Sequence, residues 1–188
     1  PDPHPSVGIV MATRRLTNAQ AGPGFFDEPA EASAPTSGRL LIVEADGGSR
    51  GNPGPAAYGA LVRDAQTLRV LAAEGLPIGR ATNNVAEYRG LIAGLEMARE
   101  LDPGAALEVR MDSKLVIEQM AGRWKIKHPD MKPLALQAAR LRPASVTWTW
   151  VPREDNKAAD TLVNRALDGD PVTRQHPVDE ETVGKLQQ

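Results

Sequence analysis

The chain has 188 residues, 41% of them hydrophobic, and carries 22 basic and 24 acidic side chains. This size and composition predict one domain with a single core plus terminal extensions, and the net charge of −2 excludes any argument for nucleic-acid binding from overall charge. Because cysteine is absent, disulfides and thiolate metal sites are excluded, which favours a reducing compartment.

The two ends of the chain differ in composition from its centre. Residues 1–38 are dominated by Pro, Ala, Gly, Ser and acidic side chains without periodicity, so we expect a disordered extension there. Residue 1 is not Met, which is typical of a processed or excised chain. The apolar run 7–12 is too short to span a membrane and has no signal-peptide layout, so we expect a cytoplasmic protein without membrane contact. Residues 170–188 are expected to form a tail or linker, which leaves 39–169 as the folded unit.

Within that unit, hydrophobic periodicity predicts the element order βββαβααβα. Strands are expected over 40–45, 57–63, 67–74, 107–111 and 146–151. Helices are expected from Asn83 or Asn84, as the capping residue, to about 101, from the cap Ser113 to about 121, over 134–141 and over 155–167. This order predicts a mixed sheet with helices packed on it.

The first strand delivers Asp46 at its end, followed by a turn rich in Gly, Asn and Pro that runs to Pro55. Backbone so lightly covered by side chains can approach a polar polymer closely. Acidic residues before Gly-rich turns are also common in ordinary hairpins. The segment therefore indicates a site only in combination with other groups.

Three further acids stand at recognisable structural positions. Asp112 follows a predicted strand, Glu87 is expected in the first turn of the long helix, and Asp160 is expected inside the last helix. Each has a structural explanation: Glu87 would favour the helix dipole, Asp160 could be an exposed helix residue, and Asp112 an ordinary strand-end acid. Their combination with the flanking segments favours a shared site.

Four segments resemble the four motif regions of type 1 ribonuclease H, in that family's order: DGGSRGNPGPAAYG, TNNVAEYRGLIAGLEMA, VRMDSKLVIEQM and WVPREDNKAADTLVNRA. The resemblance covers about residues 39–168. It implies an α/β, ribonuclease H-like fold with a five-stranded mixed sheet in the order 32145, flanked by helices. It also implies an endonuclease that cleaves the RNA strand of RNA–DNA hybrids and leaves 5′-phosphomonoester products.

The same resemblance implies a two-metal centre. Clustered carboxylates raise one another's pKa unless a cation neutralises them, and Mg²⁺ prefers such oxygen ligands. Asp46 would bridge two Mg²⁺ ions, Glu87 and Asp112 would complete one site, and Asp160 would help to hold the other, with Mn²⁺ as the alternative metal.

Substrate contacts are implied at two places. Gly51, Asn52, Asn83 and Asn84 match family positions that contact the two strands of the hybrid, although turn formation and helix capping would also explain the three asparagines. A second candidate surface is a basic cluster around an aromatic residue, which would contact phosphates or else form a solvated loop. Its members are Arg123, Trp124, Lys125 and Lys127.

The chain departs from many family members near the last acid. Arg153 stands on a short loop where relatives carry a His, and a guanidinium is a poor proton shuttle but a good phosphate partner. We expect Arg153 to act electrostatically on the scissile phosphate or departing product; the alternative is a surface ion pair with Glu154 or Asp155. The long basic protrusion of some bacterial enzymes is also missing, as in a compact subgroup of archaea and some bacteria.

Some actinobacterial relatives join such a domain to a C-terminal phosphatase, so we expect residues 170–188 to lead into a further domain of this kind, and the present chain to be a monomer. Two other functions remain open: a catalytically silent hybrid-binding module, and another enzyme of this fold such as a 3′–5′ exonuclease or transposase. The four acids favour an enzyme over the silent module. The glycine-rich first motif and the pair Asn83–Asn84 favour the endoribonuclease.

Overall fold

The computed structural model describes residues 37–187. The predicted order of the first nine elements is confirmed, and a further strand and helix follow them. The strands are β1 (Leu40–Ser49), β2 (Gly54–Asp64), β3 (Val70–Ala81), β4 (Ala106–Met111), β5 (Val146–Trp150) and β6 (Val172–Gln175). The helices are α1 (Asn83–Leu101), α2 (Lys114–Met120), α3 (Lys132–Leu141), α4 (Lys157–Leu167) and α5 (Glu180–Leu186), with a short 3-10 turn over Arg153–Asp155.

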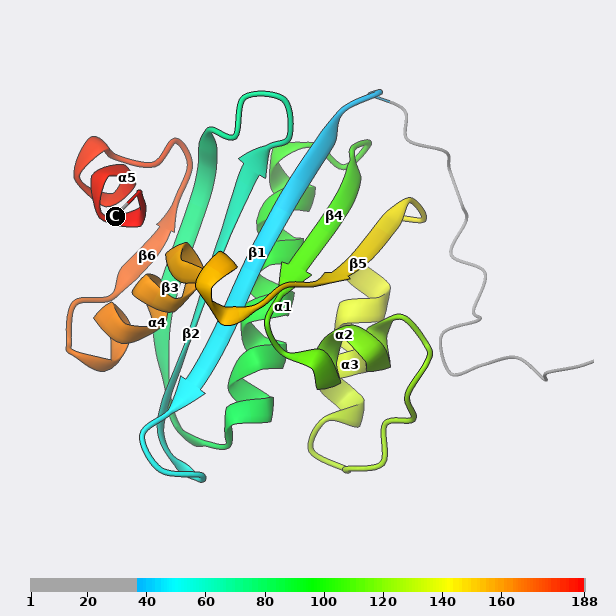
Figure 1. Cartoon of the computed structure of the whole chain (residues 1–188), viewed down its shortest axis with the longest axis vertical. Helices are drawn as coiled ribbons and strands as arrows, with labels where there is room; N and C mark the ends of the chain where they lie inside the picture. The colour runs from blue at the N-terminus through cyan, green and yellow to red at the C-terminus, as the bar shows by residue number, and fades with distance from the viewer. Residues whose placement is uncertain (1–36, 188) are drawn as a thin grey trace, which may run out of the picture.

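The strands form one sheet in the order β5-β4-β1-β2-β3-β6 (Figure 1). β1 and β5 run parallel to β4, whereas β2 pairs antiparallel with β1 and β3, and β6 pairs antiparallel with β3. The predicted mixed sheet is therefore confirmed, with its first five strands in the expected order. The sheet has six strands rather than five, because β6 extends it beyond β3.

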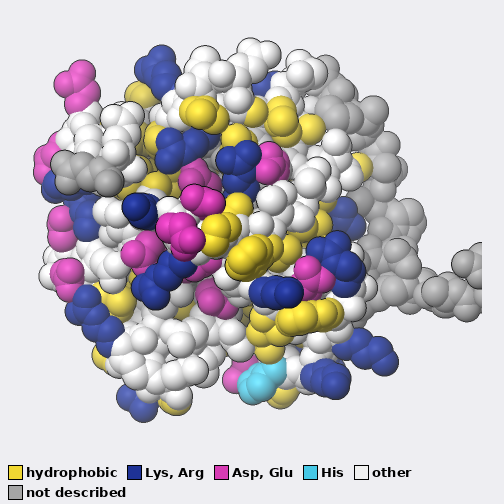
Figure 2. Space-filling model, viewed as in Figure 1, with side chains coloured by type: hydrophobic (Ala, Val, Ile, Leu, Met, Phe, Trp, Pro, Cys, Tyr) yellow, Lys and Arg dark blue, Asp and Glu magenta, His cyan; other side chains and the backbone are white. Residues whose placement is uncertain are grey.

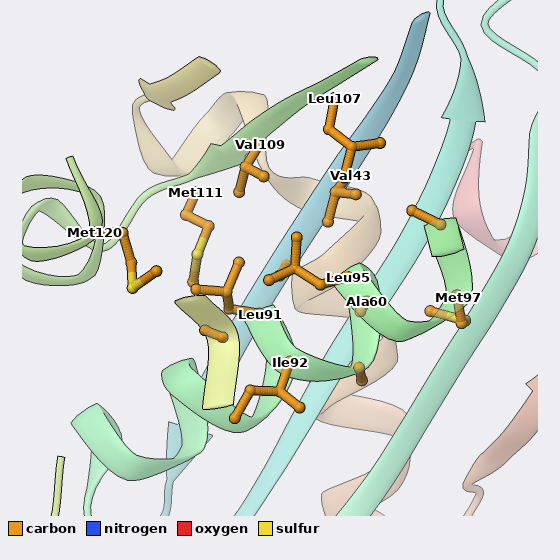
Figure 3. Packing of buried hydrophobic residues seen from close by; sticks show 14 of the residues in the cluster. Val43, Ala60, Leu91, Ile92, Leu95, Met97, Leu107, Val109, Met111 and Met120 are labelled. Carbon is orange, nitrogen blue, oxygen red and sulfur yellow. The ribbon is translucent and has the colours of Figure 1, made fainter. Parts of the chain in front are cut away.

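Helices cover both faces of the sheet. The face that carries Val43 and Ala60 packs against α1, whose Leu91 and Leu95 meet Val43, Leu107 and Val109 in the main core (Figure 3). On the opposite face, Leu61 lies in a second cluster with Leu162 of α4. Successive side chains along β2 therefore point into different clusters, Ala60 into the main core and Leu61 into the second cluster. Helix α4 packs on the face of the sheet opposite α1 (Figure 1).

The C-terminal segment differs from the expected tail or linker, since residues 172–186 form β6 and α5. Val172 and Leu186 are buried in the second cluster. Arg174 of β6 donates to Glu74 of β3 at 2.8 Å and to Glu100 of α1 at 2.7 Å. β6 has four residues, three of them polar or charged, so it carries little periodic signal, and Arg174 and Glu74 lie 100 residues apart in sequence. The folded unit therefore extends past 169.

Several predicted boundaries are also wrong. β1 continues past Asp46 to Ser49, because the glycine-rich segment pairs with β2 in register to Ala56. β3 begins at Val70 instead of 67, because Asp64 Oδ1 accepts hydrogen bonds from the backbone of Gln66 and Thr67 and lengthens the turn. The expected extension over 1–38 lies almost wholly outside the described residues. None of the helices within residues 37–187 is long and apolar enough to cross a membrane.

Candidate active site

Two glycines let α1 approach β1 closely. A Cβ atom added at Gly47 would lie 2.1 Å from the Ala86 carbonyl carbon, and one at Gly90 would lie 2.5 Å from the Asp46 carbonyl oxygen. Only residues without side chains allow these distances. The contact brings the start of α1, and Glu87 with it, against the strand that carries Asp46.

The cap of α1 differs from the prediction. Thr82 is the capping residue, and its side chain accepts a hydrogen bond from the Val85 backbone at 3.3 Å. Asn83 and Asn84 are consequently the first two residues of the helix, and Glu87 lies just beyond its first turn, so the first-turn placement of Glu87 is wrong. Thr, Asn and Asn in a row are all good capping residues, and sequence alone does not choose between them.

Asp112 follows β4 directly, as predicted, and Ser113 caps α2 by accepting from the Val116 backbone at 3.3 Å. The Ser113 hydroxyl also donates to Glu87 Oε2 at 2.8 Å, which joins the end of β4 to α1. The Asp112 carboxylate accepts a hydrogen bond at 2.8 Å from Asn156, the residue before α4. Sequence reasoning missed Asn156; its signal was only a capping-type residue four positions before Asp160.

Asp160 lies in the first turn of α4. Asn164 donates to it at 3.2 Å, and the Arg153 guanidinium approaches it at 3.9 Å. Arg153 is 80% exposed, and its ion-pair partner within the described residues is Asp160 rather than the expected alternatives Glu154 or Asp155. This pair is too long and too exposed to contribute much to stability.

The four predicted acids line one cleft. Asp46, Glu87, Asp112 and Asp160 all line it, together with Arg153 and Asn83. The cleft therefore brings together four carboxylates from β1, α1, the end of β4 and α4. Figure 2 shows acidic and basic side chains interleaved on the face that carries α4 and the lower end of β1 in Figure 1.

Burial and mutual repulsion raise the pKa of two of these acids. Burial raises the pKa of Glu87 to about 7, helped by the charge of Asp112 and opposed by the Ser113 hydrogen bond. Burial raises the pKa of Asp46 well above its usual range, and the charges of Asp112, Asp160 and Glu87 act in the same direction. A divalent cation would relieve this repulsion, and carboxylate oxygens are the donors that Mg²⁺ prefers. Among residues 37–187 no three acids or histidines already surround one ion position, so the carboxylates would have to adjust to hold it.

The asparagines of the first turn and of α1 form a short chain of hydrogen bonds. The Asn52 side-chain oxygen accepts from the Asn83 backbone at 3.2 Å, and the Asn83 side-chain oxygen accepts from the Ser49 backbone at 2.8 Å. Asn83 lines the cleft, whereas Gly51, Asn52 and Asn84 lie outside its lining. Gly51 adopts a left-handed φ of 103°, which suits glycine at this turn.

The basic cluster is not part of the cleft. Arg123, Trp124, Lys125 and Lys127 lie between α2 and α3, and none of them lines it. Arg123 forms a two-bond ion pair with Glu118, and Trp124 is 45% exposed. Gln119 ties this loop to α1, since it donates to the Lys125 carbonyl and accepts from the Tyr88 hydroxyl.

Comparisons with known proteins agree with this geometry. Residues 44–166 match the family model described as reverse transcriptase-like. The bifunctional protein Rv2228c of Mycobacterium tuberculosis is 58% identical over 130 residues, which cover 68% of this chain but only 35% of that protein. Its solved N-terminal RNase H domain is 55% identical, with a TM-score of 0.66 and coverage of 70% of this chain and 96% of that one.

Two further relatives are covered over most of their length. Ribonuclease HI of Halobacterium salinarum is 43% identical over 136 residues, or 71% of this chain and 67% of that protein. LC11-RNase H1, solved in complex with an RNA/DNA hybrid, is 39% identical with a TM-score of 0.65, covering 69% of this chain and 97% of that one. The family model matches most of the folded unit, a ribonuclease HI is 43% identical, and the first five strands have the order expected for this fold. This chain therefore belongs to the ribonuclease H family of enzymes.

Proposed function

We propose that this chain hydrolyses the RNA strand of RNA–DNA hybrids as a metal-dependent endonuclease, leaving 3′-hydroxyl and 5′-phosphate ends. The arrangement that supports this most directly is the convergence of Asp46, Glu87, Asp112 and Asp160 on one cleft. The hybrid bound to LC11-RNase H1 supports the substrate. Because the chain spans about a third of the length of Rv2228c, any second activity of that bifunctional relative stays outside this proposal.

The four carboxylates would hold two Mg²⁺ ions, or Mn²⁺ in their place. The raised pKa values of Asp46 and Glu87 support this, because burial and the neighbouring acids disfavour their ionised forms unless a cation neutralises the charge. Such ions would lower the pKa of an attacking water and neutralise charge on the departing 3′-oxygen. Asp46 is central to the proposed site, since the other three acids all act on its pKa.

The proposed discrimination of RNA from DNA rests on amide donors. The side-chain oxygens of Asn52 and Asn83 already accept backbone hydrogen bonds, so their NH₂ groups remain as the donors. Donors of this kind suit the 2′-hydroxyl and base acceptors of a wide, shallow minor groove. Gly51 and Asn84, which lie outside the lining of the cleft, would contribute further contacts beside them. Arg153, at the rim, would hold a phosphate electrostatically without transferring a proton.

The basic cluster would contact phosphates away from the cleft. Lys125 and Lys127 are its best candidates, because Arg123 is already paired with Glu118. Trp124 would stack on a sugar or base there. We infer no contact of these residues with the reacting phosphate.

An assay with an end-labelled RNA–DNA hybrid tests the proposal. Wild-type protein with Mg²⁺ or Mn²⁺ should cut the RNA strand, and duplex DNA and duplex RNA of the same sequence should stay intact. Asp46→Asn keeps the shape of the side chain but removes a charged ligand, so cleavage should fall by orders of magnitude while hybrid binding survives. Glu181→Gln, on the surface of α5, is the matched control and should cut normally.

Two outcomes would contradict the proposal. Cleavage by Asp46→Asn at the wild-type rate would remove the carboxylates from the chemistry. Hybrid binding by the wild type without cleavage under any divalent metal would favour the silent binding module.

A further inference from the structure

Asn156 is a buried amide that contacts Asp112 and the residue before Asp46. It is 1% exposed and immediately precedes α4. Its side-chain nitrogen donates to the Ala45 carbonyl at 2.9 Å and to Asp112 Oδ1 at 2.8 Å. Both partners can only accept hydrogen bonds, so the NH₂ end of the amide must face them.

Asn156 occupies the capping position of α4, but its side chain does not cap the helix. It is the residue at which an asparagine side chain would accept a backbone hydrogen bond and cap α4, a contact worth about 1 kcal/mol. No side-chain cap bond is formed, and its Oδ1 has no partner among residues 37–187. Leaving a buried polar atom unpaired is costly, so the two bonds made by the other end of the amide must outweigh it.

The two bonds connect three of the elements that carry carboxylates. Ala45 is the residue before Asp46 on β1, and Asp112 directly follows β4. The Asn156 carbonyl in turn accepts from the Asp160 backbone at 3.2 Å in the first turn of α4. One residue therefore contacts β1, the residue after β4 and the first turn of α4.

We propose that Asn156 is a positioning residue that orients Asp112 and fixes its distance from Asp46 and Asp160, so that divalent metal can bind. This rests on the proposed function. The bond to Oδ1 fixes the rotation of the Asp112 carboxylate, and Oδ2 accepts no hydrogen bond within the described part of the chain. Asparagine supplies a donor there without adding charge, whereas aspartate would place a fifth carboxylate against Asp112 and the Ala45 carbonyl.

Direct metal binding separates this role from a purely structural one. Mn²⁺ binding to the substrate-free protein can be followed by electron paramagnetic resonance, beside urea unfolding and steady-state cleavage of the hybrid. Loss of a group that orients a metal ligand typically weakens metal binding or activity by about 10–100-fold. We therefore expect Asn156→Ala to weaken Mn²⁺ binding at least about tenfold and to lower kcat similarly, with a much smaller change in KM for the hybrid.

Lys157→Ala is the matched control, because Lys157 is exposed at the start of the same helix and makes no side-chain hydrogen bond or ion pair within residues 37–187. It should not weaken Mn²⁺ binding. If Asn156→Ala does not fold, Asn156→Ser is measured in its place, because serine retains one donor of shorter reach.

A double-mutant cycle identifies the residue through which Asn156 acts. In an Asp112→Asn background, Asn156→Ala should weaken Mn²⁺ binding much less than in the wild type, because the ligand it orients is already altered. Equal losses in both backgrounds, or a folded Asn156 variant with unchanged Mn²⁺ affinity, would overturn the inference. A wild-type protein that neither binds Mn²⁺ nor cuts hybrid would instead overturn the proposed function, so the two failures are distinguishable.

Discussion

Replacing Gly47 by alanine tests how closely α1 must approach β1 for the site to form. The added Cβ atom would lie 2.1 Å from the Ala86 carbonyl carbon and 2.2 Å from the Glu87 backbone nitrogen, where 3.4 Å is an ordinary contact. These neighbours are backbone atoms, so no side chain can rotate away. The helix would have to retreat by about 1.3 Å, and Glu87 would move away from Asp46 with it.

Two magnitudes follow from this displacement. Overpacking of this kind costs about 1–3 kcal/mol, so the free energy of unfolding should fall by at least that much. A displacement of about 1 Å at a reacting centre can lower the rate about 100-fold, so cleavage of the hybrid should fall at least that far. Urea unfolding and hybrid cleavage under saturating Mg²⁺ measure the two effects separately.

Gly48→Ala is the control from the same strand. Its Cβ would meet only the Val163 side chain at 3.4 Å, so it should lose far less stability and activity than Gly47→Ala. The reasoning fails if Gly47→Ala keeps the wild-type unfolding midpoint and cleavage rate. It also fails if the two alanine variants are equally damaged, because the distance to α1 would then not be the cause.

Two further predictions concern buried charge. Arg174→Ala should lower the free energy of unfolding by about 3 kcal/mol, because it leaves the Glu74 carboxylate, 5% exposed, without its cation. Arg140 is exposed, so Arg140→Ala is the control and should be nearly neutral in the same denaturant titration. In EDTA, stability should decline as the pH rises from about 5 to about 8. The folded protein binds more protons than the unfolded chain in that window, because the pKa values of Glu87 and Asp46 are raised. Saturating Mg²⁺ should remove most of this decline, and equal unfolding midpoints at both pH values in EDTA would contradict the assignment.

The sequence predicted what short segments encode by themselves. The elements that carry or directly precede Asp46, Asp112 and Asp160 have clear periodicity and turn residues, and the motif segments contain the four acids that line one cleft. Boundaries were less predictable where neighbouring residues offer equivalent local chemistry. Thr82, Asn83 and Asn84 can each cap a helix, and the structure uses Thr82.

Contacts between distant segments were not predictable in the same way. β6 pairs with β3, where Arg174 reaches Glu74, and Asn156 contacts both Ala45 and Asp112. Neither interaction has a local sequence pattern, because hydrogen-bond geometry across elements is set only after the sheet and helices have packed. The pairing of Arg153 with Asp160 rather than with its chain neighbours has the same origin.

The four acids share a form of support from neighbouring groups. Each accepts a hydrogen bond from a neutral donor: Asp46 from the Gly47 backbone at 2.9 Å, Glu87 from Ser113, Asp112 from Asn156 and Asp160 from Asn164. Within residues 37–187 no Lys or Arg forms an ion pair with the first three, and Arg153 stays 3.9 Å from the fourth.

This choice of donors has a consequence for binding. An arginine in bidentate contact would occupy both oxygens of a carboxylate and cancel its charge, and it would compete with any metal. A single neutral donor orients the carboxylate and leaves its charge in place. The repulsion among Asp46, Glu87 and Asp112 therefore remains in the folded protein and would favour the divalent cations of the proposed site, while Gly47 and Gly90 let α1 lie close to β1 and bring Glu87 near Asp46.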